Sequence, residues 1–172
     1  MRTRSAILPD ASQIYDLIAS YSSDGTLLPR TLPEICENIR DFVVVERDGT
    51  IIGCGALHLY GMHLAEIRSI AVHASSRGAG AGRQLVEKLL SQAKKHHVTC
   101  VCLFTRIPEF FRRVGFMVAT RDQLPDKVYK DCCSCPRLHC CDEVAMIQGE
   151  LPKFSILRPL ATAIVNIQNA NG

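Results

Sequence analysis

Residues 66–82 read Glu-Ile-Arg-Ser-Ile-Ala-Val-His-Ala-Ser-Ser-Arg-Gly-Ala-Gly-Ala-Gly, and this segment is the most informative part of the sequence. Its first part alternates in polarity and predicts a strand at 66–72, with Arg68, Ile70 and Val72 on one face. A glycine loop follows, and residues 83–94 then carry apolar side chains at helical spacing. The stretch therefore predicts a strand that enters a glycine loop, and a helix that begins at the end of this loop.

Such a loop is suited to binding an anion. The first amide N–H groups of a helix have no partner within the helix, and the helix dipole makes that end positive. Glycines at 78, 80 and 82 let the backbone approach a ligand, while Arg77 and Arg83 add positive charge. A plain strand-to-helix turn is the alternative interpretation. No Gly-Lys-Ser/Thr follows, as it would in a nucleotide P-loop, and the strand at 99–105 lacks the terminal acid of a dinucleotide fold.

Length and composition narrow the class of protein. The 172 residues suit one domain with a substantial core, and a net charge of +3 gives little reason to expect a nucleic-acid partner. The sequence contains neither a run of about 18 apolar residues nor a signal-peptide pattern, so no membrane partner is expected. Nine cysteines without an export signal indicate reduced thiols and a cytoplasmic location.

The remaining patterns predict further strands and helices in one domain, 1–152. Asp48-Gly49 favours a hairpin turn, Thr31-x-x-Glu34 is a capping-box pattern, and Asp10 is a candidate helix cap. The extension at 153–172 has no clear period; packing on the sheet edge, pairing in a homodimer and partial disorder all stay open. Strands are expected at 3–8, 42–46, 51–58, 98–105, 116–119 and 143–148, with helices from Pro9-Asp10, at 31–40 and 108–114, and a helical turn at 124–130.

The motif Arg77-x-x-Gly80-x-Gly82, directly after Ile70-Ala71-Val72, resembles the acetyl-CoA motif of the GNAT N-acetyltransferase superfamily. The segment 108–116 also resembles the family's Phe-Tyr-x-x-x-Gly-Phe sequence. The resemblance covers about residues 3–148. It implies an α+β fold, with a mixed twisted sheet of about seven strands and helices on both faces.

The resemblance also implies where acetyl-CoA binds. In this family the strands beside the motif helix splay apart and the pantetheine arm lies between them, here between 70–72 and 103–105. A tyrosine that protonates the leaving thiolate in many relatives is replaced by Phe111, so the thiolate leaves unprotonated or Tyr129 or a water serves. The implied cofactor contacts are Ile70, Ala71, Val72, Arg77, Gly78, Ala79, Gly80, Ala81, Gly82, Arg83 and Phe111.

A narrower resemblance concerns the substrate. Five segments, in order, look like the acetyltransferase domain of N-acetylglutamate synthase in its short bacterial form, without the amino-acid-kinase domain. The implied reaction joins acetyl-CoA and L-glutamate to give N-acetylglutamate and CoA, the first committed step of arginine biosynthesis. The segments are Leu28-Pro-Arg-Thr-Leu32, Gly53-Cys-Gly-Ala-Leu-His58, Ala65-Glu-Ile-Arg68, Pro108-Glu-Phe-Phe111 and Leu124-Pro-x-Lys-x-x-Lys-Asp131.

Two carboxylates and one amine define what a glutamate pocket needs. Arginine binds carboxylates in a bidentate way, and the candidates are Arg30 and Arg68, although Arg68 could equally pair with an acid of the protein. Lys130 and Arg137 lie in the segment that covers the pocket in the resembling family, and solvated surface charge is their alternative interpretation.

The amine also has to lose a proton before it attacks the thioester. Glu66 is the candidate catalytic base, because it stands where many relatives carry a catalytic glutamate. A structural ion pair with Arg68 is the alternative role for Glu66. His58 and His63 are further candidates, because an unperturbed histidine titrates near neutral pH.

A second group of chemically active side chains lies near the end of the domain. Cys132, Cys135 and Cys140 could supply three thiolates to zinc, with His139 or Cys141 as a fourth ligand. A thiol pair or plain reduced cysteines are the alternatives, and the cysteines at 54, 100 and 102 fit strand patterns as small core residues.

Three functions therefore stay open. The first is acetylation of glutamate, with glutamine not distinguished from it. The second is a GNAT enzyme that acetylates another small amine, such as an aminoglycoside, or a peptide N-terminus. The third is a non-catalytic module that binds acyl-CoA or a metal.

Overall fold

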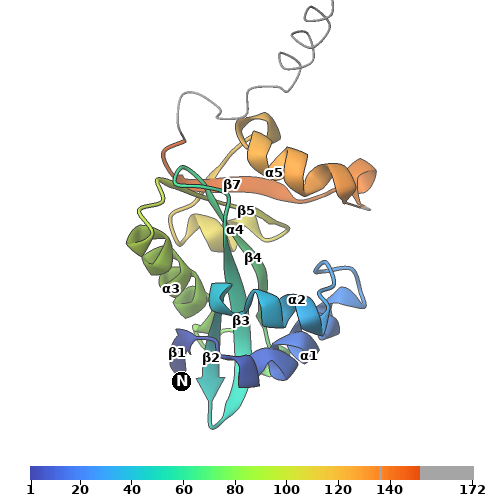
Figure 1. Ribbon diagram of the computed structural model, residues 1–172, viewed down its shortest axis with the longest axis vertical. Helices are drawn as coiled ribbons and strands as arrows, with labels where there is room; N and C mark the ends of the chain where they lie inside the picture. The colour runs from blue at the N-terminus through green and yellow to red at the C-terminus, as the bar shows by residue number, and fades with distance from the viewer. Residues whose placement is uncertain (136, 152–172) are drawn as a thin grey trace, which may run out of the picture.

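The computed structural model describes residues 1–135 and 137–151, so the extension expected at 153–172 lies outside the described residues. A mixed sheet forms the centre of the molecule (Figure 1). The strands are β1 (Arg2–Ser5), β2 (Phe42–Arg47), β3 (Thr50–Leu59), β4 (Ala65–Val72), β5 (Cys100–Thr105), β6 (Met117–Val118) and β7 (Val144–Gly149). The α-helices are α1 (Ala11–Ser22), α2 (Leu32–Glu37), α3 (Ala81–Lys95), α4 (Pro108–Arg112) and α5 (Pro125–Lys130).

The strands lie in the order β1-β2-β3-β4-β5-β7-β6, and every neighbouring pair is antiparallel except β4 and β5. This arrangement confirms the predicted α+β fold with about seven strands. The predicted elements are present, with ends that match the prediction or differ from it by at most three residues. In the part of the chain that the structure describes, no helix has the length and apolarity that crossing a membrane requires.

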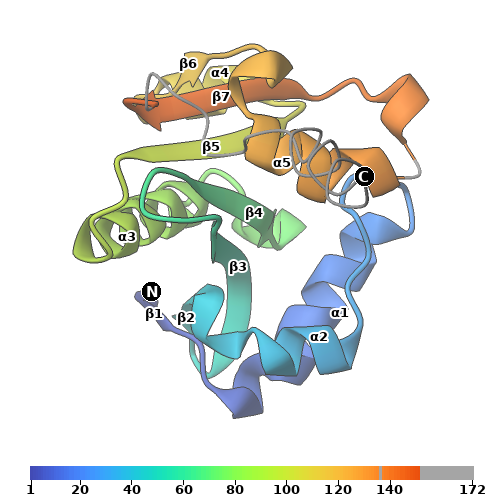
Figure 2. The same cartoon turned by 45° about the horizontal axis from the view of Figure 1, so that its top comes forward.

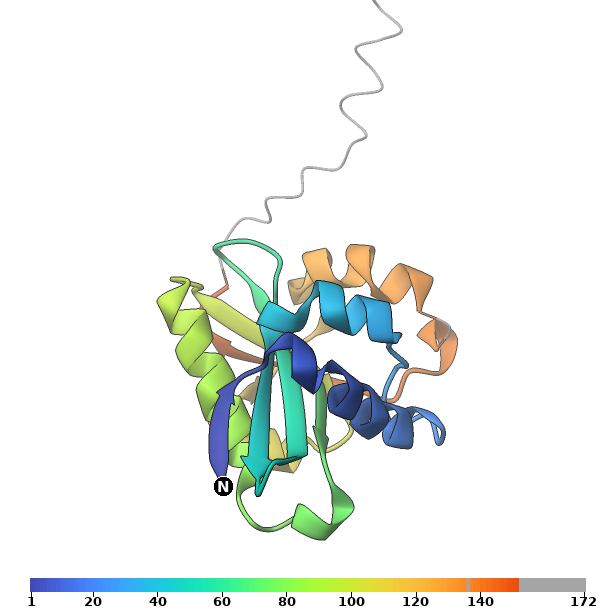
Figure 3. The ribbon, with the colours of Figure 1, turned by 60° about the horizontal axis from the view of Figure 1, so that its bottom comes forward.

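Helices cover both faces of the sheet, as Figure 3 shows with α3 on one side and α1, α2 and α5 on the other. On the first side α3 packs against inward-facing residues of the sheet, including Val43, Leu57 and Leu103. On the second side α1 and α2 pack against residues such as Val44 and Cys54. Alternate residues of the central strands thus enter two apolar layers, which explains why these strands are apolar at almost every position.

Local signals at two turns are confirmed. Asp48 and Gly49 both have positive φ angles, 51° and 77°, as the tight β2–β3 hairpin requires. Thr31 and Glu34 form the predicted capping box at the start of α2. Asp10 does not cap α1, because its carboxylate instead accepts hydrogen bonds from Arg4 and from the Ile7 amide in the turn before that helix.

A β-bulge in β4 changes which side chains of this strand share a face. Arg68 pairs with Ala56 whereas Ala71 pairs with Cys54, so β4 has one residue more than β3 between these pairs. Ser69 has a φ of 54° at this point. The extra residue interrupts the regular alternation of side chains between the two faces of the sheet. Ile70 therefore packs on the α3 side, while Arg68 lies on the opposite face. The prediction that Arg68, Ile70 and Val72 share one face is therefore wrong.

The sheet opens beside this bulge. β4 and β5 are paired only through Ala65 with Val101 and Glu66 with Cys102. Beyond these pairs the two strands diverge (Figure 2). The divergence leaves one edge of the second half of β4 without a neighbouring strand in the described structure. This opening creates the space for the site described next.

Candidate active site

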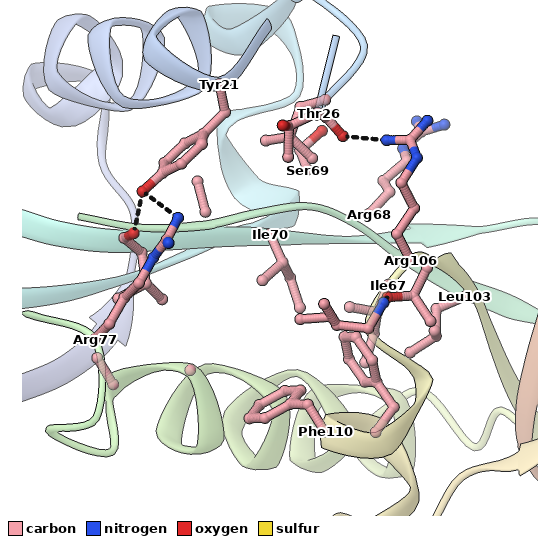
Figure 4. Close-up of a pocket in the computed structure, with 18 of the residues that line it drawn as sticks. Tyr21, Thr26, Ile67, Arg68, Ser69, Ile70, Arg77, Leu103, Arg106 and Phe110 are labelled. Carbon is pink, nitrogen blue, oxygen red and sulfur yellow. Dashed lines mark hydrogen bonds between the residues drawn. The ribbon is translucent and has the colours of Figure 1, made fainter. Parts of the chain in front are cut away.

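A cavity of about 660 Å³ fills the opening between β4 and β5. Its lining comes from the end of α1, from both diverging strands, from the glycine loop with the start of α3, and from α4. Figure 4 shows apolar side chains, among them Ile67, Ile70 and Phe110, at its centre, with Arg77 near one end and Arg106 near the other. The cavity is thus a mainly apolar channel with cationic ends.

The glycine loop forms one end of the channel. Gly78 and Gly80 have φ angles of 80° and 84°, which glycine adopts without strain, and a Cβ on either would point into open space. α3 begins at Ala81, two residues earlier than predicted, so Gly82 belongs to its first turn. A Cβ on Gly82 would lie 3.3 Å from the Phe110 ring. Two glycines therefore shape an exposed backbone, and the third allows α4 to pack closely.

Arg77 is held at this end by a tyrosine that the sequence analysis missed. The Tyr21 hydroxyl donates a hydrogen bond to the Val72 carbonyl at 2.6 Å, and Arg77 donates to that hydroxyl at 3.2 Å (Figure 4). The Arg77 guanidinium also lies over the Tyr21 ring, 5.5 Å from its centre. Arg83 is exposed and pairs with Glu87 at 2.8 Å. Both arginines thus lie at the rim of the glycine loop.

Aromatic residues of α4 form the apolar wall. Phe111 is buried and contacts Phe110 edge to face, with the ring centres 4.9 Å apart. Both rings line the cavity. Phe111 therefore lies where the sequence analysis expected it, and its side chain offers no hydroxyl to the cavity.

Arg106 closes the opposite end and was also missed. Its guanidinium donates a hydrogen bond to the Thr26 carbonyl at 2.9 Å (Figure 4). It also donates to the Gly25 carbonyl at 3.3 Å and pairs with Asp142 at 2.7 Å. These contacts fasten the loop after α1 to the end of β5. No sequence pattern points to this role, because two of its three partners are backbone carbonyls about 80 positions away.

Arg68 and Arg30 both line a small hollow beside the cavity. Glu34, Asn38 and Asp41 line the same hollow. Arg68 lines both spaces. Its guanidinium lies 3.9 Å from the Glu66 carboxylate and 3.8 Å from that of Asp131. Among the described residues, neither contact is short enough for a hydrogen bond, so the guanidinium retains donors for a ligand.

The structure does not bring the other two predicted cations into these spaces. Lys130 is exposed, and its ammonium lies 3.2 Å from Nε2 of His58. Arg137 donates to the Gly25 carbonyl at 2.9 Å and lies 3.8 Å from Asp142. Their predicted contact with substrate stays a prediction.

Glu66 is buried in a polar cluster beside Arg68. Its carboxylate lies 2.7 Å from the Lys127 ammonium and 2.9 Å from the Tyr60 hydroxyl. It does not line the large cavity. Lys127, not Arg68, is therefore its closest cationic partner. The sequence analysis quoted Lys127 within the segment 124–131 without assigning it a role and did not single out Tyr60, because the partners of both come from different elements.

Burial and charge alter the protonation of groups around Glu66. Burial and the carboxylates of Glu66 and Asp131 raise the pKa of the Tyr60 hydroxyl, so it keeps its proton. Burial acts to lower the pKa of Lys127, but the same two carboxylates outweigh it and raise that pKa, so the ammonium stays charged. Burial, followed by the charges of Arg68 and Lys130, lowers the pKa of His58 to about 4, so the ring is neutral at pH 7.

The remaining histidine and cysteine candidates lie in other surroundings. Nε2 of His63 is 2.9 Å from the Asp126 carboxylate on α5. Within residues 1–135 and 137–151 no group of three or more His, Cys, Asp or Glu side chains could hold a metal ion. The zinc hypothesis for Cys132, Cys135 and Cys140 therefore finds no ligand cluster there.

Comparisons with known proteins agree with this architecture. A family model described as the acetyltransferase (GNAT) family matches residues 11–116. The chain therefore belongs to the GNAT acetyltransferases. It is an N-acetyltransferase that uses acetyl-CoA.

Curated relatives include proteins that this chain covers over most of their length and longer proteins that it covers only in part. The chain is 40% identical over 145 residues to an uncharacterised N-acetyltransferase of Chlorobaculum tepidum, with 84% of this chain and 94% of the relative covered. It is 32% identical over 135 residues to the amino-acid acetyltransferase of Mycobacterium tuberculosis, covering 77% and 75% of the two chains. Other amino-acid acetyltransferases are longer, and the chain spans 28% of the Vibrio atlanticus protein at 32% identity over 126 residues, 72% of this chain.

Solved structures of similar fold include two that contain CoA. One is a Mycobacterium tuberculosis protein in complex with CoA and NLQ, with a TM-score of 0.75, 27% identity, and coverage of 88% of this chain and 100% of that chain. The other is N-acetylglutamate synthase from Neisseria gonorrhoeae complexed with coenzyme A and N-acetyl-glutamate, with a TM-score of 0.77 and 25% identity. Here 86% of this chain and 34% of that chain are covered.

Proposed function

We propose that this acetyltransferase transfers the acetyl group of acetyl-CoA to the α-amine of L-glutamate. The observation that carries the proposal is Arg68, which lines both the large cavity and the hollow shared with Arg30. Glutamate has two carboxylates, and a planar guanidinium binds a carboxylate through two parallel hydrogen bonds. Two arginines beside the cavity therefore suit an amino acid with two acidic groups. The names of the amino-acid acetyltransferase relatives support the same substrate class.

The residues around the large cavity fit acetyl-CoA. The open backbone at Gly78 and Gly80 gives an anionic group access to amide donors, and the rim arginines match the charge of a diphosphate. We assign the diphosphate to residues 78–83 with Arg77, and the pantetheine arm to the unpaired edge of 70–72. The apolar wall, which includes Phe111, lines the space in which we place this arm. Acetyl-CoA supplies the acetyl group as a thioester.

Glu66 is our candidate to accept the proton of the substrate amine, directly or through water. It is the buried carboxylate on β4, next to Arg68 in the strand and 3.9 Å from its guanidinium. Lys127 balances its charge at 2.7 Å. Phe111 cannot protonate the leaving thiolate, and Tyr129, the alternative donor, is 71% exposed and does not line the cavity. The thiolate therefore leaves as the anion or receives a proton from water.

The direct test is acetyl transfer across a panel of amines. L-Glutamate, L-glutamine, glycine, a short peptide and an aminoglycoside are each incubated with acetyl-CoA and the full chain. Products are separated by chromatography, because the nine cysteines of the protein would react with a thiol reagent. We expect kcat/KM for glutamate to exceed that for glycine at least about tenfold, the scale of one charge-assisted hydrogen bond. Equal rates for glycine, or a preference for the peptide, would show that the substrate assignment is wrong.

A further inference from the structure

The Tyr60 hydroxyl joins two carboxylates that come from different parts of the chain. It lies 2.9 Å from Oε2 of Glu66 on β4 and 2.5 Å from Oδ2 of Asp131 at the end of α5. The two carboxylates differ in exposure, since the Glu66 side chain is 4% exposed and that of Asp131 is 30% exposed. A chain of three oxygen-bearing groups thus leads from a buried acid to a more exposed one.

The number of protons available determines what these three oxygen-bearing groups can do. A tyrosine hydroxyl has one proton to donate, whereas two ionised carboxylates can only accept. With both acids ionised, only one of the two short contacts is a hydrogen bond. One additional proton on Glu66 or Asp131 completes the second bond. The arrangement therefore accommodates a proton that arrives from elsewhere.

The surrounding charges keep the cluster balanced. Lys127 lies 2.7 Å from Glu66 and 3.2 Å from Asp131, and Arg68 lies within 4 Å of both. Two cations thus match two carboxylates. A substrate carboxylate bound at Arg68 would add a negative charge, and one proton taken up by the cluster would restore neutrality. Other titratable groups near this cluster are Glu34 and Asp41, which share the hollow with Arg68, and His58 on β3. Cys102 on β5, Lys130 on α5 and Cys132 just after α5 also lie near it.

We propose that Tyr60 relays a proton from Glu66 to Asp131, and so returns Glu66 to its ionised form after each turnover. This inference rests on the proposed role of Glu66. The protonated Glu66 carboxyl gives its proton to the Tyr60 oxygen while the Tyr60 proton passes to Asp131. The O–H bond of Glu66 and that of Tyr60 break, and new O–H bonds form on Tyr60 and Asp131. Asp131, which is partly exposed, then releases the proton to solvent.

Tyr60→Phe removes the oxygen and keeps the ring, which contacts His58 edge to face and lies beneath the Lys130 ammonium. We expect kcat to fall about 100-fold, the lower end of the range for a lost proton-transfer group, while KM for the amine changes by less than about twofold. Added imidazole should restore much of kcat, because a small base can replace the missing route. Asp131→Asn should show the same rescue, and this second variant keeps the test valid where Tyr60→Phe does not fold.

Two comparisons make the test decisive. In the double variant Tyr60→Phe/Glu66→Gln the loss should equal that of Glu66→Gln alone, because both groups serve one path. The control Tyr15→Phe removes a hydroxyl from an exposed tyrosine of α1 and should leave kcat unchanged. A Tyr60→Phe protein with wild-type kcat, a loss that imidazole does not rescue, or losses that multiply would each overturn the relay.

The relay and the substrate assignment can fail separately. The variants are assayed with whichever amine of the panel the wild-type protein acetylates best. A preference for glycine or peptide would remove glutamate as substrate while the imidazole rescue still tests the relay. A preference for glutamate with no rescue would remove the relay and leave the proposed substrate in place.

Discussion

At the scale of single residues, the site depends on a few arginines. The hydrogen-bond partners of each arginine determine whether it holds the protein together or is available to a ligand. Arg106 and Arg137 donate to backbone carbonyls of the loop after α1 and hold that loop in place. Arg68 has acids nearby but, in the described part of the chain, no short hydrogen bond. We therefore propose a structural task for Arg106 and a ligand-binding task for Arg68, while substrate contact by Arg137 stays a prediction.

The first prediction concerns Arg68. Arg68→Lys keeps the charge but removes the planar fork that grips a carboxylate through two hydrogen bonds. We expect KM for glutamate to rise about 10- to 100-fold, or about 1.4–3 kcal/mol, while KM for acetyl-CoA stays nearly constant. Steady-state kinetics with both substrates measures the change. Arg40→Lys, at an exposed arginine before β2, is the control; equal effects of the two variants would contradict the assignment.

The second prediction concerns pH and Asp10. The Arg4 guanidinium and the Ile7 amide hold the pKa of the Asp10 carboxyl below its ordinary value of 3.8. A lowered folded-state pKa contributes stability above the ordinary pKa, and this contribution is lost as the pH falls through the folded-state value. Asp10→Asn should therefore lower the free energy of unfolding at pH 7 by about 1–3 kcal/mol. In urea titrations the difference from wild type should shrink between pH 5 and pH 3, and a constant difference would contradict this account.

At the scale of elements, the glycine loop and the first turn of α3 carry the cofactor assignment. Gly80 precedes α3 with a φ of 84°, and Gly49 has a φ of 77° in the hairpin at the far end of β3. A Cβ on either residue meets no atom within 4 Å. The two positions therefore share a backbone requirement, and only one of them lies at the proposed diphosphate site.

The third prediction uses this pair. Gly80→Ala and Gly49→Ala should each lower the free energy of unfolding by about 1 kcal/mol, because alanine is strained at positive φ. Only Gly80→Ala should weaken CoA binding, by about tenfold, since its methyl group would occupy the approach to the amides. Calorimetric titration with CoA measures this difference. Similar dissociation constants for the two variants would show that the diphosphate does not use this loop.

Sequence patterns predicted the elements well and their irregularities poorly. Glycine spacing and periodicity placed β4, the loop and α3 within two residues. The bulge at Ser69 escaped because alternation assumes an even strand, and one extra residue moves Arg68 to the other face. Tyr21 and Tyr60 escaped for another reason, since both bond to groups that are distant in the sequence or on neighbouring strands. Periodicity shows which side chains are buried, and it does not show which backbone or carboxylate oxygens they meet.

At the scale of the whole molecule, the divergence of β4 from β5 divides the sheet and makes room for the site. The burial of the cysteine side chains in the strands shows that the rest of the sheet is closed to solvent. Cys54, Cys100 and Cys102 are buried in strands, as predicted, whereas Cys133 and Cys140 are exposed. Burial raises the pKa of Cys54 to about 12 and that of Cys100 to about 11, which disfavours their reactive thiolate form.

The fourth prediction follows from this burial. Iodoacetamide at pH 8 should label Cys133 and Cys140 within minutes, while the three strand cysteines should react only after the protein unfolds in urea. Peptide mass spectrometry measures labelling at each position. Rapid labelling of Cys54 or Cys102 in the native protein would contradict the closed sheet.

A crystal structure of the chain with CoA and N-acetylglutamate would test the proposed cofactor and substrate sites together. We expect the diphosphate to lie against the amides of 78–83 and the pantetheine arm to lie between β4 and β5. We also expect a product carboxylate on the Arg68 guanidinium. A diphosphate bound away from the glycine loop, or a product whose carboxylates contact neither Arg68 nor Arg30, would contradict these assignments.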